Sequence, residues 1–265
     1  MKLLIIGYGN MAGAMLDGWL ACGMAPGNFA VLNRSPKPAP EGVRVFADIA
    51  EAEATGGHDA VLLGFKPHQL GEAAPGLAAL AEGRAVHSLL AGITCTQLEK
   101  AFAGAVAHVR VMPNLASRIN KSPILLAASG LSGARRDATS ALYDALGSAV
   151  WMEDEARFDL ATALAGSGPG FVYRFIDALA AAAHSLGLDK PQADSLALAM
   201  VEGAAALAAG SDCSPGELAD RVASPGGMTR EGLNVLDEGG ALEDLLTRTL
   251  DATARRGAEL SQRNG

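Results

Sequence analysis

The stretch KLLIIGYGNMAGAML, residues 2–16, decides the fold of this chain. Its apolar run at 3–6 predicts a buried strand, and the helical spacing after it predicts a helix. Between them a GxGxxA pattern permits a tight turn, close approach of a pyrophosphate to the backbone, and close helix packing. The first helical turn offers free N–H groups and a positive dipole to an anion. We therefore expect a dinucleotide to contact Gly7, Tyr8, Gly9, Asn10, Met11 and Ala12.

Outward from this stretch, short apolar runs alternate with helical stretches as far as residue 153. Continuous apolar strands separated by helices predict a parallel sheet covered on both faces. Two further runs, 124–128 and 150–152, are expected to add edge strands around a helix at 134–146. The predicted fold class is α/β, with an N-terminal Rossmann-type, doubly wound, mainly parallel sheet in residues 1–153. Its first six strands are expected at 3–6, 29–32, 43–46, 60–63, 85–89 and 109–112.

After residue 153 the β-rich runs stop, which predicts a C-terminal all-α domain over residues 154–265. The segments 173–186 and 196–209 carry apolar residues or alanine on nearly every face, as helices buried on several sides do. One small domain offers too little cover for both, so we expect a dimer interface here. The predicted helices are 156–164, 169–187, 191–209, 214–222, 229–238 and 241–262.

The end of the second predicted strand indicates which dinucleotide is bound. An NAD site commonly has an acidic residue here that holds the ribose 2′-hydroxyl. This chain has Asn33, Arg34 and Ser35 instead, a cation and two hydrogen-bonding groups that suit a 2′-phosphate. We therefore expect NADP, with NADPH preferred over NADH. The alternative is that Arg34 is a solvated loop residue.

Three later strand ends are further candidates for cofactor contact, because ligands of open parallel sheets lie beyond the carboxyl ends of the strands. Each could equally be an ordinary turn from strand to helix, and Lys66 could be a plain surface lysine. The expected cofactor-binding residues at these ends are Gly64, Phe65, Lys66, Pro67, Ala91, Gly92, Pro113 and Asn114.

Composition and charge exclude several classes of function. The net charge of −8, without any block of Lys or Arg, gives no footprint for nucleic acid or an anionic membrane. The histidines lack metal-ligand spacing, so no metal site is expected. No apolar stretch reaches the ~18 residues of a membrane span, and the apolar run near Met1 is too short for a signal peptide. Three scattered cysteines fit a reduced, cytoplasmic protein.

Six blocks in this order resemble the pyrroline-5-carboxylate reductase family across nearly the whole chain. They are GYGNMA (7–12), GFKP (64–67), LLAGI (89–93), RVMPN (110–114), TALAGSGPGF (162–171) and SPGGMT (224–229). The resemblance implies NAD(P)H-dependent reduction of 1-pyrroline-5-carboxylate to L-proline. It also implies a homodimer interlocked through the helical domains, larger rings of dimers, and a 224–229 loop that faces the nicotinamide of another subunit.

The chain departs from the family pattern at several positions. Ala165 stands where Ser is usual, Gly170 replaces the usual Ala, and Met228 occupies a position where a small residue or Thr is common. The run LASRINKSPI, residues 115–124, replaces the typical Thr-Pro and glycine-rich continuation. This segment is expected near the nicotinamide and the substrate. Its divergence therefore bears on substrate preference more than on fold or cofactor.

Reduction of a cyclic imine requires a hydride donor, a protonated C=N bond and an anchor for the substrate carboxylate. In the 224–229 loop, Gly226 and Gly227 could turn N–H groups toward one point, at the start of a helix. The hydroxyls of Ser224 and Thr229 could hold the carboxylate or a water beside the imine nitrogen. We assign Thr229 the catalytic position, and the expected substrate-binding residues are Thr162, Ser224, Gly226, Gly227, Met228 and Thr229.

Other interpretations remain open at the level of the sequence. The 224–229 loop could be a plain helix-to-helix turn with Thr229 as an N-cap. The enzyme could reduce another cyclic imine, or the chain could be a non-catalytic NADP-binding regulatory protein. A 3-hydroxyacid dehydrogenase shares the two-domain plan but relies on a catalytic lysine from the helical domain. It is disfavoured because no lysine occurs between Lys121 and Lys190.

Overall fold

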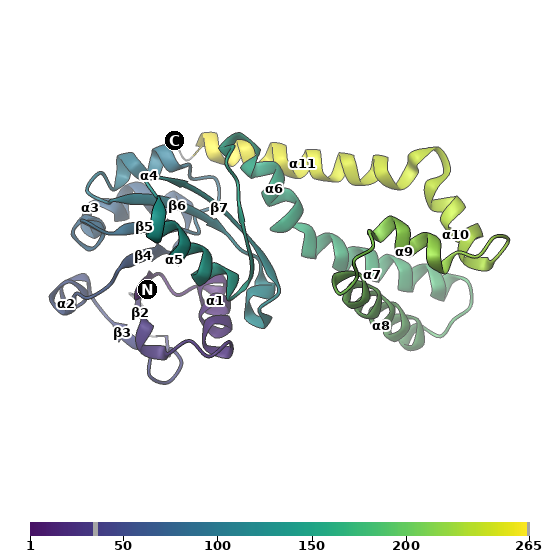
Figure 1. Cartoon of the computed structure of the whole chain (residues 1–265), viewed down its shortest axis with the longest axis horizontal. Helices are drawn as coiled ribbons and strands as arrows, with labels where there is room; N and C mark the ends of the chain where they lie inside the picture. Colours follow the sequence, from purple (N-terminus) through teal and green to yellow (C-terminus); the bar gives the residue numbers. More distant parts are fainter. Residues whose placement is uncertain (34–36, 264–265) are drawn as a thin grey trace. The chain divides into compact units, whose positions relative to one another are not determined.

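An eight-stranded sheet forms the centre of the N-terminal part of the computed structural model, which describes residues 1–33 and 37–263 (Figure 1). The strand order is β3-β2-β1-β4-β5-β6-β7-β8. The strands are β1 Leu3–Ile6, β2 Phe29–Leu32, β3 Arg44–Phe46, β4 Ala60–Leu63, β5 Ala85–Ser88, β6 Ala107–Met112, β7 Ser122–Ser129 and β8 Gly147–Trp151.

The sheet is mainly parallel, as predicted. Every neighbouring pair of strands runs parallel except β6 and β7, which pair antiparallel. The prediction of two edge strands at 124–128 and 150–152 is wrong for the first of them, because β7 lies between β6 and β8. Only residues 113–121 join β6 to β7, too few for the crossover that a parallel neighbour needs, so the chain turns back on itself.

Eleven α-helices surround or follow the sheet within the described residues, and each predicted helix is present to within about two residues. Five short 3-10 helices join them, among them Pro67–Gln69, Leu115–Ile119 and Glu155–Arg157. The α-helices are α1 Asn10–Ala21, α2 Ile49–Thr55, α3 Leu70–Ala81, α4 Cys95–Ala101, α5 Gly133–Asp144, α6 Phe158–Ala165, α7 Gly168–Ser185, α8 Lys190–Ala209, α9 Pro215–Val222, α10 Met228–Asp237 and α11 Ala241–Arg263.

The two faces of the sheet carry separate apolar cores, which explains why the strands read as continuous apolar runs. Leu3 and Ile5 of β1 face one core, completed by residues of α1 and α5, and Trp19 stacks there on Phe29. Leu4 and Ile6 face the other core, completed by residues of α2, α3 and α4. Successive side chains of a strand point to opposite faces, so both must be apolar when both faces are covered.

The contacts divide the chain into two units. One contains Met1–Ser167 together with the chain from Ala252 onward, and the other contains Gly168–Asp251. This differs from the predicted boundary between residues 153 and 154, because α6 packs against β7 through Phe158 and the end of α11 returns to the first unit. The division into an NADP-binding domain at 1–153 and a substrate-binding and dimerisation domain at 154–265 stays a prediction.

The second unit has little apolar core of its own. Its buried cluster consists of Ala180, Ala193 and Ala197, with partly buried neighbours on α7. By contrast, Tyr173, Leu186 and Leu207 are 67%, 89% and 76% exposed. Apolar helix faces left uncovered on this scale mark a surface that a partner buries.

No helix among the described residues combines the length and apolar character needed to cross a lipid bilayer. Within the same residues, no three His, Cys, Asp or Glu side chains are grouped so that they could hold a metal ion. The three cysteines, Cys22, Cys95 and Cys213, are free thiols.

Candidate functional site

The turn between β1 and α1 lies directly against the end of β4. Gly7 has φ +89°, and a Cβ atom there would lie 2.9 Å from the Phe65 nitrogen. A Cβ atom on Gly64 would lie 2.5 Å from the Gly7 carbonyl oxygen, and the Gly64 N–H donates to Ile6 at 2.7 Å. Two of the sequence blocks are thus in contact, and both glycines are required by close backbone packing.

The N-terminus of α1 is left open to an anion. Gly9 is its N-cap and supplies no side-chain cap, and the first turn contains no acidic residue. A Cβ atom on Gly9 would meet only the Gly64 oxygen, at an ordinary 3.7 Å, so protein packing alone does not demand glycine here. A bare backbone with uncapped N–H groups fits the pyrophosphate of a dinucleotide.

Tyr8 lies in this turn and is 8% exposed. Burial, and next the carboxylate of Asp17, raise the pKa of its hydroxyl, which therefore stays neutral. The Nζ atom of Lys37 donates to the Tyr8 carbonyl at 3.1 Å and lies 4.6 Å from the centre of the Tyr8 ring. Sequence reasoning missed Lys37, whose only signal was its position shortly after the second strand.

The end of β2 is described only in part. The Asn33 N–H donates to the Phe46 carbonyl at 3.3 Å, which continues the sheet by one residue. Arg34 and Ser35, the other two residues expected at the ribose, lie outside the described residues.

The ends of β4 and β5 supply two further loops at the same edge of the sheet. The Lys66 N–H donates to Gln69 Oε1 at 3.0 Å, and its exposed side chain precedes Pro67 in a 3-10 turn. Ala91 is exposed, whereas Gly92 has φ +75° and would bring a Cβ atom to 3.0 Å from the Ser261 nitrogen of α11. Close packing against α11 therefore explains why position 92 is a glycine, whether or not a cofactor contacts it.

Asn114, at the end of β6, is 6% exposed and makes several hydrogen bonds within the protein. Its Nδ2 donates to the Ala165 carbonyl and its Oδ1 accepts the Ala116 N–H, both at 2.9 Å. Pro113 beside it is buried. These contacts join the end of β6 to α6, so Asn114 positions α6 against the sheet.

Thr162, expected at the substrate, lies on α6 within the unit that contains the sheet. Its Oγ1 is buried and has no partner among the described residues. Buried hydroxyls are normally hydrogen-bonded, so an unpartnered one is available to a ligand or a bound water. Gly166, one turn later, would place a Cβ atom 3.7 Å from Met112 Cγ, which sets α6 beside the end of β6.

A buried arginine on β6 holds α6 in place. Arg110, whose side chain is 6% exposed, pairs with Glu155 at 2.8 Å and lies 3.7 Å from Asp159. Its guanidinium also lies 4.0 Å from the ring centre of Phe158. Glu155 additionally accepts the Cys95 N–H at 2.9 Å, and burial raises the pKa of the Cys95 thiol to about 11. Sequence reasoning missed this cluster because its members are scattered through the chain.

The 224–229 loop lies in the second unit, between α9 and α10. Gly226 has φ +71°, and the Gly227 N–H donates to the Ser224 carbonyl at 2.9 Å, so that N–H closes the turn and is not free for a ligand. Gly227 is the N-cap of α10, which makes the alternative role of Thr229 as an N-cap wrong. The uncapped N–H groups belong to the first turn, beginning at Met228, whose side chain is 94% exposed.

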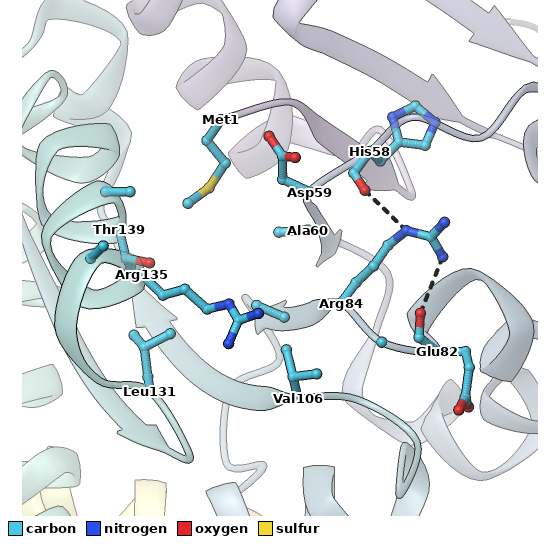
Figure 2. A pocket seen from close by; sticks show the side chains of 14 residues that line it. Met1, His58, Asp59, Ala60, Glu82, Arg84, Val106, Leu131, Arg135 and Thr139 are labelled. Atoms are coloured by element: carbon cyan, nitrogen blue, oxygen red, sulfur yellow. Dashed lines mark hydrogen bonds between the residues drawn. The ribbon is translucent and has the colours of Figure 1, made fainter.

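A cavity of about 580 Å³ lies elsewhere, near the amino ends of β4 and β5 (Figure 2). Ala60 and Ala85, the first residues of these strands, line it. Arg84 lies in its wall and donates to the His58 carbonyl at 3.0 Å. Since Gly64 and Ala91 lie at the opposite ends of the strands, this cavity is separate from the candidate cofactor loops.

Comparison with known proteins gives matches over the full length. Residues 155–260 match the family model described as pyrroline-5-carboxylate reductase dimerisation, and residues 2–92 match one described as NADP oxidoreductase coenzyme F420-dependent. Pyrroline-5-carboxylate reductase 2 of Bacillus subtilis is 33% identical, covering 98% of this chain and 95% of its own. The Pseudomonas aeruginosa reductase is 33% identical, covering 100% and 98%. The structure of a Coxiella burnetii pyrroline-5-carboxylate reductase matches with a TM-score of 0.90, at 32% identity and 98% coverage of both chains.

Proposed function

The chain belongs to the pyrroline-5-carboxylate reductase family, and from this we propose that it reduces 1-pyrroline-5-carboxylate to L-proline with NADPH, the last step of proline biosynthesis. The observation that carries the proposal is the extent of the match. It includes both the glycine turn of the first unit and the 224–229 loop of the second, so neither half of the proposed site is missing.

The first unit is an NADP-binding domain, and we assign it the cofactor. When bound, NADPH supplies the hydride for the imine carbon. The open first turn of α1 holds the pyrophosphate, and Gly7 and Gly64 keep the backbone close enough for that contact. The preference for NADPH over NADH is part of the proposal and is assigned to the loop after β2.

The first turn of α10 and the hydroxyls of Ser224 and Thr229 are assigned to the substrate. Uncapped N–H groups at a helix N-terminus bind a carboxylate well, and they lie in the turn that begins at Met228. An iminium carbon is already electrophilic, so the protein needs only to orient the ring and hold a water or the nitrogen by the Thr229 hydroxyl. No buried carboxylic acid is required.

Self-association follows from the dimerisation domain at 155–260. We propose that the exposed apolar faces of α7 and α8 form the homodimer contact, and that each active site takes the 224–229 loop from one subunit and the nicotinamide from another. Larger rings of dimers are part of the same proposal. The free thiols Cys22, Cys95 and Cys213 suit a reducing cytoplasmic location.

The function is tested by mixing the purified protein with NADPH and a panel of cyclic imines while the cofactor absorbance is followed. We expect turnover with 1-pyrroline-5-carboxylate and formation of L-proline. Turnover with other ring sizes alone would contradict the proline assignment. Binding of NADPH without turnover of any imine would contradict the enzyme assignment and favour a regulatory protein.

A preference for another cyclic imine is the second candidate. It is favoured by the divergent segment after Asn114, in which Leu115 and Ile119 are 55% and 64% exposed. Exposed apolar side chains beside the end of β6 could select a substrate with a larger apolar part. The panel therefore includes six-membered and alkyl-substituted imino acids.

Replacing Thr229 by Val should raise KM for the imino acid, because a hydroxyl that contacts the substrate is lost while the helix start is kept. We expect a rise of about tenfold, with the affinity for NADPH changed less than twofold. Thr96→Val, an exposed threonine on α4, serves as the control. An unchanged KM for Thr229→Val would remove this hydroxyl from the site.

A further inference from the structure

Lys37 is fixed on the turn that begins the dinucleotide site. Its Nζ atom donates to the carbonyl of Tyr8 at 3.1 Å and lies 4.6 Å from the centre of the Tyr8 ring. A lysine side chain is otherwise mobile, and these two contacts hold its charge against the segment between Gly7 and Gly9.

The charge of Lys37 is not neutralised within the described residues. The side chain is exposed, and no ion pair there involves it. Asp17, the carboxylate that acts on Tyr8, pairs with Arg118 at 3.1 Å instead. An ammonium group has three N–H donors, and the Tyr8 carbonyl uses one of them. Two donors and a full positive charge remain for an anion.

The place of Lys37 in the fold indicates which anion the lysine binds. The residue follows β2, and the loop after the second strand is where a Rossmann-type domain distinguishes the ribose 2′-hydroxyl of NAD from the 2′-phosphate of NADP. We propose that Lys37 is a specificity-determining residue, which binds the 2′-phosphate of NADPH while it is held by Tyr8. This rests on the proposed function.

A contact of Lys37 with the pyrophosphate is the competing assignment, because Tyr8 lies in the turn that the pyrophosphate approaches. The two differ in a measurable way. The pyrophosphate is common to NAD and NADP, so a lysine there would favour both cofactors equally. A lysine at the 2′-phosphate favours NADP alone.

Isothermal titration calorimetry of the full-length protein with NADP⁺ and NAD⁺ tests this without turnover. For Lys37→Gln we expect the Kd of NADP⁺ to rise by about tenfold or more and that of NAD⁺ to change less than twofold. Lys37→Arg, which keeps the charge, should restore NADP⁺ binding to within about threefold. Lys100→Gln on α4 removes the same charge from an exposed site and should change neither Kd.

Three results would overturn the assignment: an equal rise in both Kd values, no rise in either, or loss of NAD⁺ binding. Retained NAD⁺ binding also shows that the variant is folded. The proposed function is tested separately, by reduction of 1-pyrroline-5-carboxylate with NADPH in the unmodified protein. If that reduction is absent while NADP⁺ still binds, the proposed function fails, and the two Kd values still decide the role of Lys37.

Discussion

Gly7 is required to be glycine both by its backbone conformation and by its close packing. Its φ of +89° is unfavourable for any residue with a Cβ atom, and that atom would lie 2.9 Å from the Phe65 nitrogen. We expect Gly7→Ala to lower the free energy of unfolding by more than the roughly 1–3 kcal/mol of a strained conformation alone. Urea denaturation measures this, and NADP⁺ binding should weaken in parallel.

Gly23 provides a matched control for Gly7. Its φ is +91°, but a Cβ atom there would meet nothing within 4 Å. Gly23→Ala therefore carries the conformational strain without the clash and should bind NADP⁺ normally. If the two variants lose the same stability and bind NADP⁺ equally well, the contact between Gly7 and Phe65 does not shape the turn.

The buried pair of His87 and Tyr143 predicts a pH dependence of stability. His87 Nδ1 lies 2.7 Å from the Tyr143 hydroxyl, and burial lowers the pKa of His87 to about 4. The unfolded chain binds a proton below its ordinary pKa of about 6.5, whereas the folded chain does not until about pH 4. Stability is therefore full above pH 6.5 and falls by about 3 kcal/mol on acidification to pH 4.

Urea unfolding at several pH values between 4 and 7 checks this expectation. His87→Gln has no titrating imidazole, so its stability should change less steeply with pH than that of the unmodified protein. His68→Gln, at an exposed position, should leave the slope unchanged. Identical slopes for the protein and for His87→Gln would show that another group governs the acid response.

At the scale of elements, Arg110 attaches α6 to the sheet. Arg110→Leu would leave Glu155 and Asp159 without their partner, and both carboxylates keep about a third of their side-chain surface in water. We expect a loss of about 2–3 kcal/mol, below the 3–5 kcal/mol typical of a fully buried pair. Hydrogen exchange should rise in α6 and stay unchanged in α1.

Arg174→Ala is the control, since the pair of Arg174 with Asp177 is 81% and 67% exposed. Its removal should change stability by at most about 0.5 kcal/mol. Equal effects of the two substitutions, or unaltered exchange in α6 of Arg110→Leu, would contradict the positioning role of Arg110.

Most elements could be predicted from the sequence because periodicity reports burial. Both faces of β1 are covered, so its apolar run is continuous, and the glycine spacing identified the turn after it. The direction of β7 could not be predicted, because an apolar run is the same in either direction and only the short connection from β6 decides. Lys37 was missed for a related reason, since a single lysine in a loop forms no pattern.

At the scale of the whole molecule, the two units differ in how they are stabilised. The first has an apolar core on each face of its sheet, whereas the second buries mainly alanines and leaves large side chains such as Leu186 and Leu207 exposed. The apolar residues on nearly every face of the predicted helices at 173–186 and 196–209 predicted a dimer interface. The match of residues 155–260 to a dimerisation family is consistent with that prediction. The sequence could not indicate that α6 packs with the sheet, because that depends on Arg110 and its distant carboxylates.

We propose that the molecule reduces a cyclic imine whose carboxylate is held by the first turn of α10. The most direct test compares kcat/KM for 1-pyrroline-5-carboxylate with kcat/KM for 1-pyrroline, the same ring without the carboxylate, at saturating NADPH. We expect the carboxylate to raise kcat/KM by about 100-fold or more, because 1-pyrroline lacks the charged group that the N–H donors of α10 would bind. Equal values of kcat/KM for the two imines would contradict it.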